Sequence, residues 1–341
     1  MDELSQIDPI HRRRNHAVTV FGGGGFVGSA LVRRLVADGY EVAVADNFLA
    51  GSRTHLTGIP GLGPVISMDV LDFDAVRKYL LANRPALIVN CVGDTFIPSA
   101  YDHPERFLDI NVRATLNLLR AAVESRAERV LHLSSTEVYG DHGAHACKED
   151  APLAPENTYA VSKLAADRLC YTFALEHGLT TVIARLFNAY GPRETHPYIV
   201  PEIIAQLSRG PELTLGNLQA ERDFTYVDDT AAALAALLRV PVSAGEVFNI
   251  GSGNPVSIRY LAELLAVLMG HGSINFSVDP QRLRRRELNR LSCDAGKLHA
   301  RTGWAPAVDL RQGLERTLAW FNENDRRWLW QRVADAASVQ A

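Results

Sequence analysis

Residues 17–35 read AVTVFGGGGFVGSALVRRL: a short β-branched run, then four glycines, then apolar residues at helical spacing. The pattern predicts a strand, a tight turn and a helix. Glycines at this junction let the backbone approach a pyrophosphate, whose charge the free N–H groups of the helix N-terminus stabilise. We expect a dinucleotide to contact the loop at Gly22, Gly25, Phe26, Val27 and Gly28.

Acidic residues end the next two predicted strands. Asp46 ends EVAVAD (41–46), at roughly the 20-residue distance expected for a carboxylate that binds ribose hydroxyls. It favours NAD over NADP because a carboxylate repels a 2′-phosphate, although Arg53 lies nearby. Asp69, followed by Val70, ends PVISMD (64–69) and is placed to reach the adenine. Asp72 is better suited to cap the following helix.

The same alternation of apolar strand and amphipathic helix continues through 86–91, 129–134 and 181–187. Near-continuous apolar strands separated by helices predict a parallel sheet covered on both faces, hence a doubly wound α/β (Rossmann) domain. After residue 188 prolines and turn formers break the rhythm. We therefore predict a tail at 1–16, a dinucleotide domain at 17–188 to which 226–258 returns, a smaller C-terminal α/β substrate region at 189–225 and 259–325, and a C-terminal tail or helix at 326–341.

Composition excludes several classes of protein. The net charge of −4 argues against a nucleic-acid-binding protein, which would usually be basic. No apolar run reaches the roughly 20 residues that a membrane span needs. The first residues lack the apolar region of a secretory signal. Four cysteines lie far apart, which argues against a metal site and against a disulfide framework. Reduced thiols fit a cytoplasmic protein.

A reactive pair is predicted in YAVSK (159–163), where Tyr159 and Lys163 lie four residues apart on a helix capped by Asn157 or Thr158. Beside an ammonium and an oxidised nicotinamide the phenolate is favoured, so Tyr159 can act as a general base near neutral pH. Ser135, in SSTEVYG (134–140), can bond the same substrate hydroxyl. The group fits proton removal from an alcohol while hydride leaves for NAD.

Taken together, GGGGFVG, VADN, SSTEVYG, YAVSK, RLFNAYGPR, RDFTYVDD and TGWAP resemble the extended short-chain dehydrogenase/reductases that act on nucleotide sugars. The resemblance covers about 17–323. It implies an NAD site that includes Asn47, with Tyr159 as base, Lys163 on the nicotinamide ribose and Ser135 at the catalytic Ser/Thr position. It also implies a nucleoside-diphosphate sugar bound by Asn188 and by two diphosphate-binding arginines, Arg222 and Arg284.

The resemblance leaves three reactions open, which share oxidation of the sugar at its 4-position. A 4-epimerase needs no further residue, whereas a 4,6-dehydratase needs an added acid and base. Thr136 stands where the dTDP-glucose dehydratases have an acidic residue, and Glu137 occurs in all the groups. The sequence therefore favours the epimerase narrowly, with the dehydratase next and UDP-glucuronate decarboxylase third, its pocket built around Ser135 and Thr136. A non-catalytic NAD sensor is a remote alternative because fold does not imply function.

Assembly and sugar contacts are also expectations from the resemblance. The family forms homodimers through helices matching 104–123 and 158–176, and Phe107, Ala114 and Leu118 suit either that interface or the core. The sugar is expected to meet the loops 94–101 and 194–200, including Thr95, with His196 and Tyr198 as further candidates.

Overall fold

The computed structural model describes residues 16–143 and 145–332 of the 341-residue chain. Nearly all of the expected N-terminal tail, and the end of the expected C-terminal tail or helix, lie outside the described residues. None of the helices in the described part has the length and apolar character that crossing a bilayer requires.

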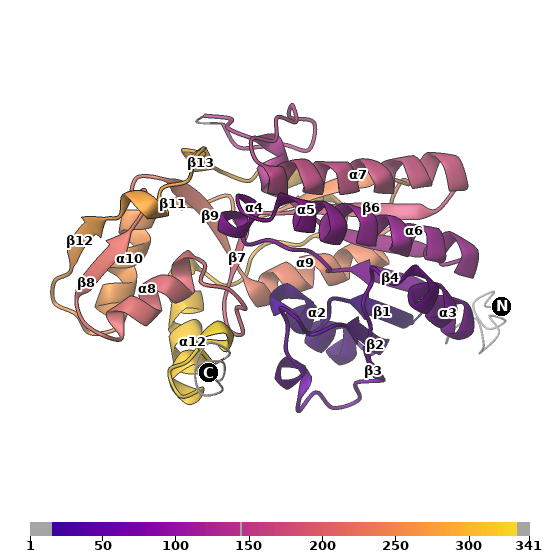
Figure 1. The fold of residues 1–341 in the computed structure, drawn as a ribbon, viewed down its shortest axis with the longest axis horizontal. Helices are drawn as coiled ribbons and strands as arrows, with labels where there is room; N and C mark the ends of the chain where they lie inside the picture. Colours follow the sequence, from indigo (N-terminus) through magenta and orange to yellow (C-terminus); the bar gives the residue numbers. More distant parts are fainter. Residues whose placement is uncertain (1–15, 144, 333–341) are drawn as a thin grey trace.

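A parallel sheet of seven strands forms the centre of the larger domain (Figure 1), as the sequence predicts. Its order is β10-β6-β5-β4-β1-β2-β3. The strands are β1 (Ala17–Phe21), β2 (Glu41–Asp46), β3 (Val65–Ser67), β4 (Leu87–Asn90), β5 (Arg129–Ser135), β6 (Thr180–Leu186) and β10 (Glu246–Ile250). The chain order reverses between β1 and β4, and doubly wound folds bind ligands at the carboxyl ends of the strands around such a point.

Helices cover both faces of this sheet. One face packs on α2 (Phe26–Ala37), α9 (Val227–Arg239) and α11 (Gly296–Thr302), and the other on α3 (Phe73–Asn83), α6 (Ala114–Ser125) and α7 (Thr158–His177). Within β1, Val18 and Val20 point to the first set while Phe21 points to the second. Burial on both faces explains why the strands read as near-continuous apolar runs.

The smaller region has its own core. It contains β7 (Asn188–Tyr190), β9 (Glu221–Tyr226), β11 (Pro255–Ser257) and β13 (Arg290–Leu291) in one sheet, the pair β8 (Glu212–Leu215) and β12 (Asn275–Val278), and the helices α8 (Ile199–Leu207), α10 (Ile258–Leu268) and α12 (Leu310–Glu323). Trp328, from the predicted C-terminal segment, is fully buried and stacks on Phe321 of α12. This part of the segment therefore caps the chain's own core.

The helix predicted over 104–123 is divided, which corrects that prediction. After α4 (Ile97–Ala100), α5 (Pro104–Phe107) is joined to α6 by a π-helical turn at Leu108–Arg113. Within the turn, Asn111 Oδ1 accepts a hydrogen bond from the Asp94 backbone N–H (2.8 Å) and Asn111 Nδ2 donates to the Asp94 carbonyl (3.0 Å). The turn thus holds the loop that follows β4, and π-turns are frequent at functional sites.

Candidate active site

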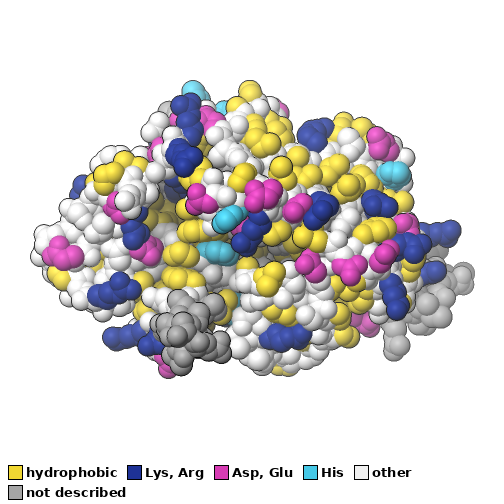
Figure 2. All heavy atoms as spheres, viewed as in Figure 1, with side chains coloured by type: hydrophobic (Ala, Val, Ile, Leu, Met, Phe, Trp, Pro, Cys, Tyr) yellow, Lys and Arg dark blue, Asp and Glu magenta, His cyan; other side chains and the backbone are white. Residues whose placement is uncertain are grey.

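A cavity of about 900 Å³ lies between the carboxyl ends of the sheet strands and the smaller region. The surface is hollowed where the two regions meet, with hydrophobic side chains along the hollow (Figure 2). Most of the predicted site residues line the cavity. Those that do are Gly22, Gly25, Phe26, Val27, Gly28, Thr95, Ser135, Thr136, Glu137, Tyr159, Lys163, Asn188, Arg222 and Arg284. Residues far apart in the chain therefore meet at one site.

The glycine loop between β1 and α2 fits a dinucleotide. Gly22 has φ +76°, a conformation that favours glycine, and a Cβ on Gly28 would lie 2.2 Å from the Gly22 carbonyl oxygen. Gly25, the N-cap of α2, supplies no side-chain hydrogen bond, and the first turn carries no acidic residue. The first N–H groups of α2 are thus left for an anion such as a pyrophosphate.

Asp46 lies at the carboxyl end of β2, beside this loop. Its Oδ2 accepts a hydrogen bond from the Gly24 N–H (2.8 Å) and its Oδ1 from the Phe48 N–H (2.7 Å). Burial raises the pKa of Asp46, while these two hydrogen bonds and the nearby Arg53 act in the opposite direction. The carboxylate is therefore held at the height where a ribose would lie.

Asp46 is not part of the cavity lining, and neither are the remaining predicted cofactor residues, Asn47, Asp69 and Val70. Asn47 is exposed, and its side chain accepts a hydrogen bond from the Leu49 N–H (3.2 Å). Asp69 is exposed and bonds the Leu71 N–H (2.9 Å), while Val70 is buried. Asp72 caps α3 as expected, because its Oδ1 accepts from the Ala75 N–H (3.0 Å).

Tyr159 and Lys163 lie on the buried side of α7, which is capped by Asn157, whose Oδ1 accepts from the Ala160 N–H (2.8 Å). Burial raises the pKa of Tyr159, and the Ser135 hydroxyl acts against this rise. Burial lowers the pKa of Lys163 to about 8. Lys163 Nζ donates to the Leu133 carbonyl at the end of β5 (2.5 Å). The geometry brings a phenol, a hydroxyl and a buried amine together, as the sequence predicts.

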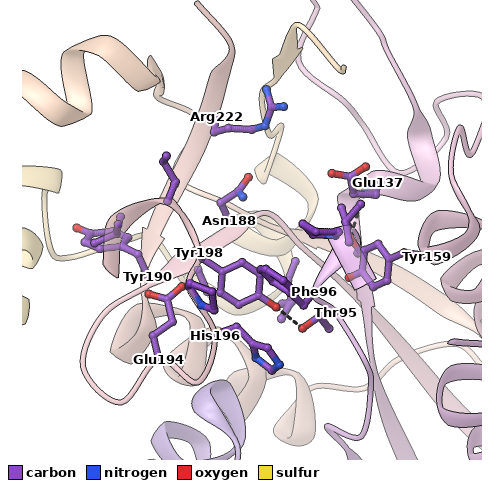
Figure 3. A pocket seen from close by; sticks show the side chains of 18 of the residues that line it. Thr95, Phe96, Glu137, Tyr159, Asn188, Tyr190, Glu194, His196, Tyr198 and Arg222 are labelled. Atoms are coloured by element: carbon purple, nitrogen blue, oxygen red, sulfur yellow. Dashed lines mark hydrogen bonds between the residues drawn. The ribbon is translucent and has the colours of Figure 1, made fainter. Parts of the chain in front are cut away.

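Glu137 follows β5 in the short 3₁₀ helix at Thr136–Tyr139 and lies in the cavity wall near Tyr159 (Figure 3). Its side chain is only 8% exposed. One carboxylate oxygen accepts from Arg284 (3.0 Å) and the other from Asn157 Nδ2 (3.1 Å). Two hydrogen bonds compensate for the cost of burying this charge and fix its position.

Two arginines, Arg222 and Arg284, line the cavity near Glu137, with which Arg284 forms an ion pair (3.0 Å). Arg222, on β9, pairs with Glu287 (2.7 Å), and its pKa is lowered by burial and by the neighbouring Arg284 guanidinium. Arg222 is buried, whereas the Arg284 side chain is 31% exposed. Two adjacent guanidinium groups can bind a dianion such as a diphosphate, whose oxygens suit their geometry. Asn188 lies beside Arg222 (Figure 3), and its buried Oδ1 has no hydrogen-bond partner among the described residues, so a ligand can supply one.

Aromatic residues from the two predicted loops close the floor of the cavity. The hydroxyls of Thr95 and Tyr198 share a hydrogen bond (2.5 Å), and the rings of Phe96 and His196 stack with their centroids 5.6 Å apart (Figure 3). Phe96 was not predicted from the sequence. It stands in a loop without periodicity, and only the presence of an aromatic beside Thr95 could have indicated it.

A second residue missed from the sequence is Glu194, which also lines the cavity. It is 2% exposed, and its Oε2 has no hydrogen-bond partner within the described part of the chain. Burial raises the pKa of this carboxyl well above its ordinary value. Because a glutamate between turn-forming residues is usually solvated, the sequence carried no signal for its burial.

Comparison with known proteins places this site in context. The family model described as GDP-mannose 4,6 dehydratase matches residues 19–317. The UDP-glucuronic acid decarboxylase 1 of Xenopus tropicalis is 32% identical over 316 residues, which cover 90% of this chain and 72% of that protein.

Two solved structures share the fold. The dTDP-glucose 4,6-dehydratase DesIV of Streptomyces venezuelae, solved with NAD, has a TM-score of 0.84 and 31% identity, covering 91% of this chain and 98% of that one. The UDP-glucose 4-epimerase of Thermotoga maritima, solved with UDP-glucose, has a TM-score of 0.83 and 26% identity, covering 90% and 99%. Proteins named for all three reactions considered above are thus similar to this chain.

Proposed function

The chain belongs to the GDP-mannose 4,6-dehydratase family, and from this premise we propose that it is an NAD-dependent 4,6-dehydratase of a nucleoside-diphosphate hexose. One observation carries the proposal: Glu137 is a buried carboxylate fixed in the cavity wall beside Tyr159. The sequence favoured the epimerase because no further residue was required. Glu137 occurs in all three groups of enzymes, so its presence does not discriminate among them. Its burial in the cavity wall supports the reaction that needs a further ionisable residue there.

Each step of the dehydration has a residue for it. NAD held by the glycine loop and Lys163 would supply a hydride acceptor at C4 and a hydride donor at C6, so that it would not be consumed. Tyr159 accepts the proton of the 4-hydroxyl, with its phenolate stabilised by Lys163. The resulting ketone makes the C5 proton acidic, and Glu137 removes it. The same carboxyl, now protonated, donates to the departing 6-hydroxyl, which leaves as water. A proton from water then adds at C5 and completes the 4-keto-6-deoxy sugar, and Tyr159 releases to water the proton that it took from the 4-hydroxyl.

The substrate's other end would be held by charge. Arg222, which is buried, and Arg284, which is partly exposed, supply two guanidinium groups for the diphosphate, and Asn188 offers nearby an oxygen without a partner among the described residues. A diphosphate dianion relieves the repulsion between the two cations. The nucleoside-diphosphate part would therefore lie against the smaller region, with the sugar directed toward Tyr159 and Glu137.

Replacing Glu137 by glutamine tests the assignment. The amide keeps the shape of the side chain but cannot accept the C5 proton, so dehydration should fall by about a hundredfold or more. The measurement is product formation followed by liquid chromatography with mass detection. Glu156→Gln is a matched control, because Glu156 also pairs with an arginine, Arg286, but outside the cavity.

If Glu137→Gln keeps wild-type turnover while remaining folded, the carboxylate is not the base and the epimerase becomes the better proposal. The ion pair with Arg284 favours that second candidate, because a carboxylate oxygen that already accepts a hydrogen bond from a guanidinium at 3.0 Å can have a structural role that needs no proton transfer. A 4-epimerase would use Tyr159, Lys163 and Ser135 alone.

The cofactor preference gives a further prediction. Wild-type protein should bind NAD at least about tenfold more tightly than NADP, because Asp46 repels a 2′-phosphate. Asp46→Asn removes the charge and should narrow this ratio, as measured by fluorescence titration with both cofactors. Asp69→Asn is the control, since Asp69 is exposed and its side chain accepts a hydrogen bond from the nearby Leu71 N–H. An unchanged ratio in Asp46→Asn would remove Asp46 from the ribose site.

Assembly as a homodimer is a further part of the proposal. Phe107, Ala114 and Leu118 are buried within the chain, so they belong to the core. Other apolar residues of the same helical segments are exposed: Leu108 at 46%, Val161 at 47% and Leu175 at 67%. These side chains support an interface that uses the helices of the expected dimer.

A further inference from the structure

The reactive helix carries a third ionisable residue beyond the pair that the sequence indicated. Tyr159, Lys163 and Asp167 follow one another at four-residue spacing on α7, and all three side chains are buried. Residues at this spacing lie one above the other on a helix. Asp167 does not line the cavity and is 1% exposed. It therefore lies next to Lys163 on the side away from the substrate.

Asp167 forms a fully buried ion pair. Its Oδ2 accepts a hydrogen bond from Arg185 Nε on β6 (3.0 Å), and the two side chains are 1% and 3% exposed. Arg185 is held in turn by Tyr139, whose ring centre lies 4.8 Å from the guanidinium carbon and whose hydroxyl donates to Asn249 Oδ1 (2.6 Å). Burying such a pair is costly compared with an apolar substitute, so its position next to the reactive lysine calls for a role.

The surroundings of Lys163 leave its charge dependent on Asp167. Burial lowers the pKa of the ammonium, and the Asp167 carboxylate makes the largest contribution in the opposite direction. The other ionisable groups near Lys163 or its partner Asp167 are Tyr159, Cys91, Cys170, His132 and Arg185. Burial raises the pKa of both thiols and lowers that of the imidazole, so these three groups are neutral near pH 7.

We propose that Asp167 is a positioning residue that keeps Lys163 protonated, so that the lysine can hold Tyr159 as the phenolate. This inference rests on the function proposed above. Tyr159 and Lys163 share one proton in two ways: phenolate with ammonium, or phenol with amine. A fixed negative charge behind Lys163 favours the first arrangement, which is the one that can accept a proton from the substrate.

The sign of the pH effect follows from these charges. The ammonium is present below the pKa of Lys163, about 8, and is lost as the pH rises through it. Removing the Asp167 carboxylate removes the contribution that opposes burial, and therefore lowers this pKa. The alkaline limb of the activity profile should therefore move to lower pH.

The pH profile is measured for two variants, so that misfolding of one of them does not prevent the test. Asp167→Asn leaves Arg185 buried without its partner, whereas the double variant Asp167→Asn with Arg185→Gln removes both charges and keeps polar groups in place. Both should show the shifted alkaline limb, and Asp167→Glu should restore most of the wild-type profile. Glu246→Gln is the control, because it disrupts a partly buried ion pair with Lys297 and Arg301 remote from Lys163.

A titration of Tyr159 separates this inference from the proposed function, because it needs no turnover. The ultraviolet absorbance of the phenolate is followed against pH in each protein, and the spectrum of the matching Tyr159→Phe variant is subtracted. In the double variant the Tyr159 phenolate should appear at a pH higher by about 1 unit or more. An unchanged titration in a folded double variant would overturn the role of Asp167. Absence of turnover on every sugar, with the titration shifted, would refute the proposed function and leave the role of Asp167 standing.

Discussion

Replacing Tyr159 by phenylalanine is expected to lower turnover by about a thousandfold, because it removes the group that accepts the substrate's hydroxyl proton. The ring stays, so the buried packing against Phe107 is retained. The free energy of unfolding should change by no more than about 1 kcal/mol, since one hydroxyl in contact with Ser135 is lost. Product formation and thermal unfolding measure the two effects.

Tyr171→Phe is the matched control, because Tyr171 lies on the same helix, outside the cavity, with Arg168 over its ring. It should keep full activity. Undiminished turnover in a folded Tyr159→Phe variant would refute the common first step of the dehydratase, the epimerase and the decarboxylase alike.

Gly28→Ala should abolish measurable NAD binding and destabilise the fold by about 3 kcal/mol. The added methyl would lie 2.2 Å from the Gly22 carbonyl oxygen, which is backbone and cannot turn aside. Relief requires the turn to open, and the turn is what presents the N–H groups of α2 to a pyrophosphate. Calorimetry with NAD and chemical denaturation test both parts.

The control for this variant is Gly272→Ala. Gly272 is exposed, and a Cβ there would meet no atom within 4 Å. It should bind NAD as the wild type does. If Gly28→Ala also bound NAD with unchanged affinity, the loop between β1 and α2 would not be the dinucleotide site.

The parts of the fold and site that could be predicted from sequence are those fixed by local patterns. The β1 and β2 boundaries follow from β-branched runs that end at Gly22 and at Asp46. The pairing of Tyr159 with Lys163 follows from helical geometry alone. In each case the signal lies within one strand, one turn or one helix, where spacing determines which side chains face together.

The parts that could not be predicted depend on contacts between distant segments. Glu137 takes its partners from Asn157 and Arg284, the latter 147 positions away. Spacing holds no information about such pairs. The π-turn at Asn111 is another example, because it depends on side-chain bonds to Asp94 and to Ser162 of α7. The local sequence pattern predicts an ordinary helix over 104–123.

The burial of charged side chains also could not be predicted from the sequence. In the sequence, Asp167 has the pattern of a solvent-exposed helix residue, and only the fold shows that Arg185 of β6 pairs with it. The hydrogen bond between Thr95 and Tyr198 likewise joins residues 103 positions apart. Charged side chains are rarely buried without a partner, but the sequence does not indicate which residue will form the ion pair.

The most direct test of the proposed reaction is the mass of the product. Purified protein is incubated with UDP-, dTDP-, GDP- and CDP-hexoses and with UDP-glucuronate, and the products are resolved by liquid chromatography with mass detection. If the protein is a 4,6-dehydratase, one hexose substrate gives a product lighter by one water, formed without net consumption of NAD. A new product of unchanged mass, or loss of carbon dioxide from UDP-glucuronate with no dehydration of any hexose, would contradict the proposed reaction.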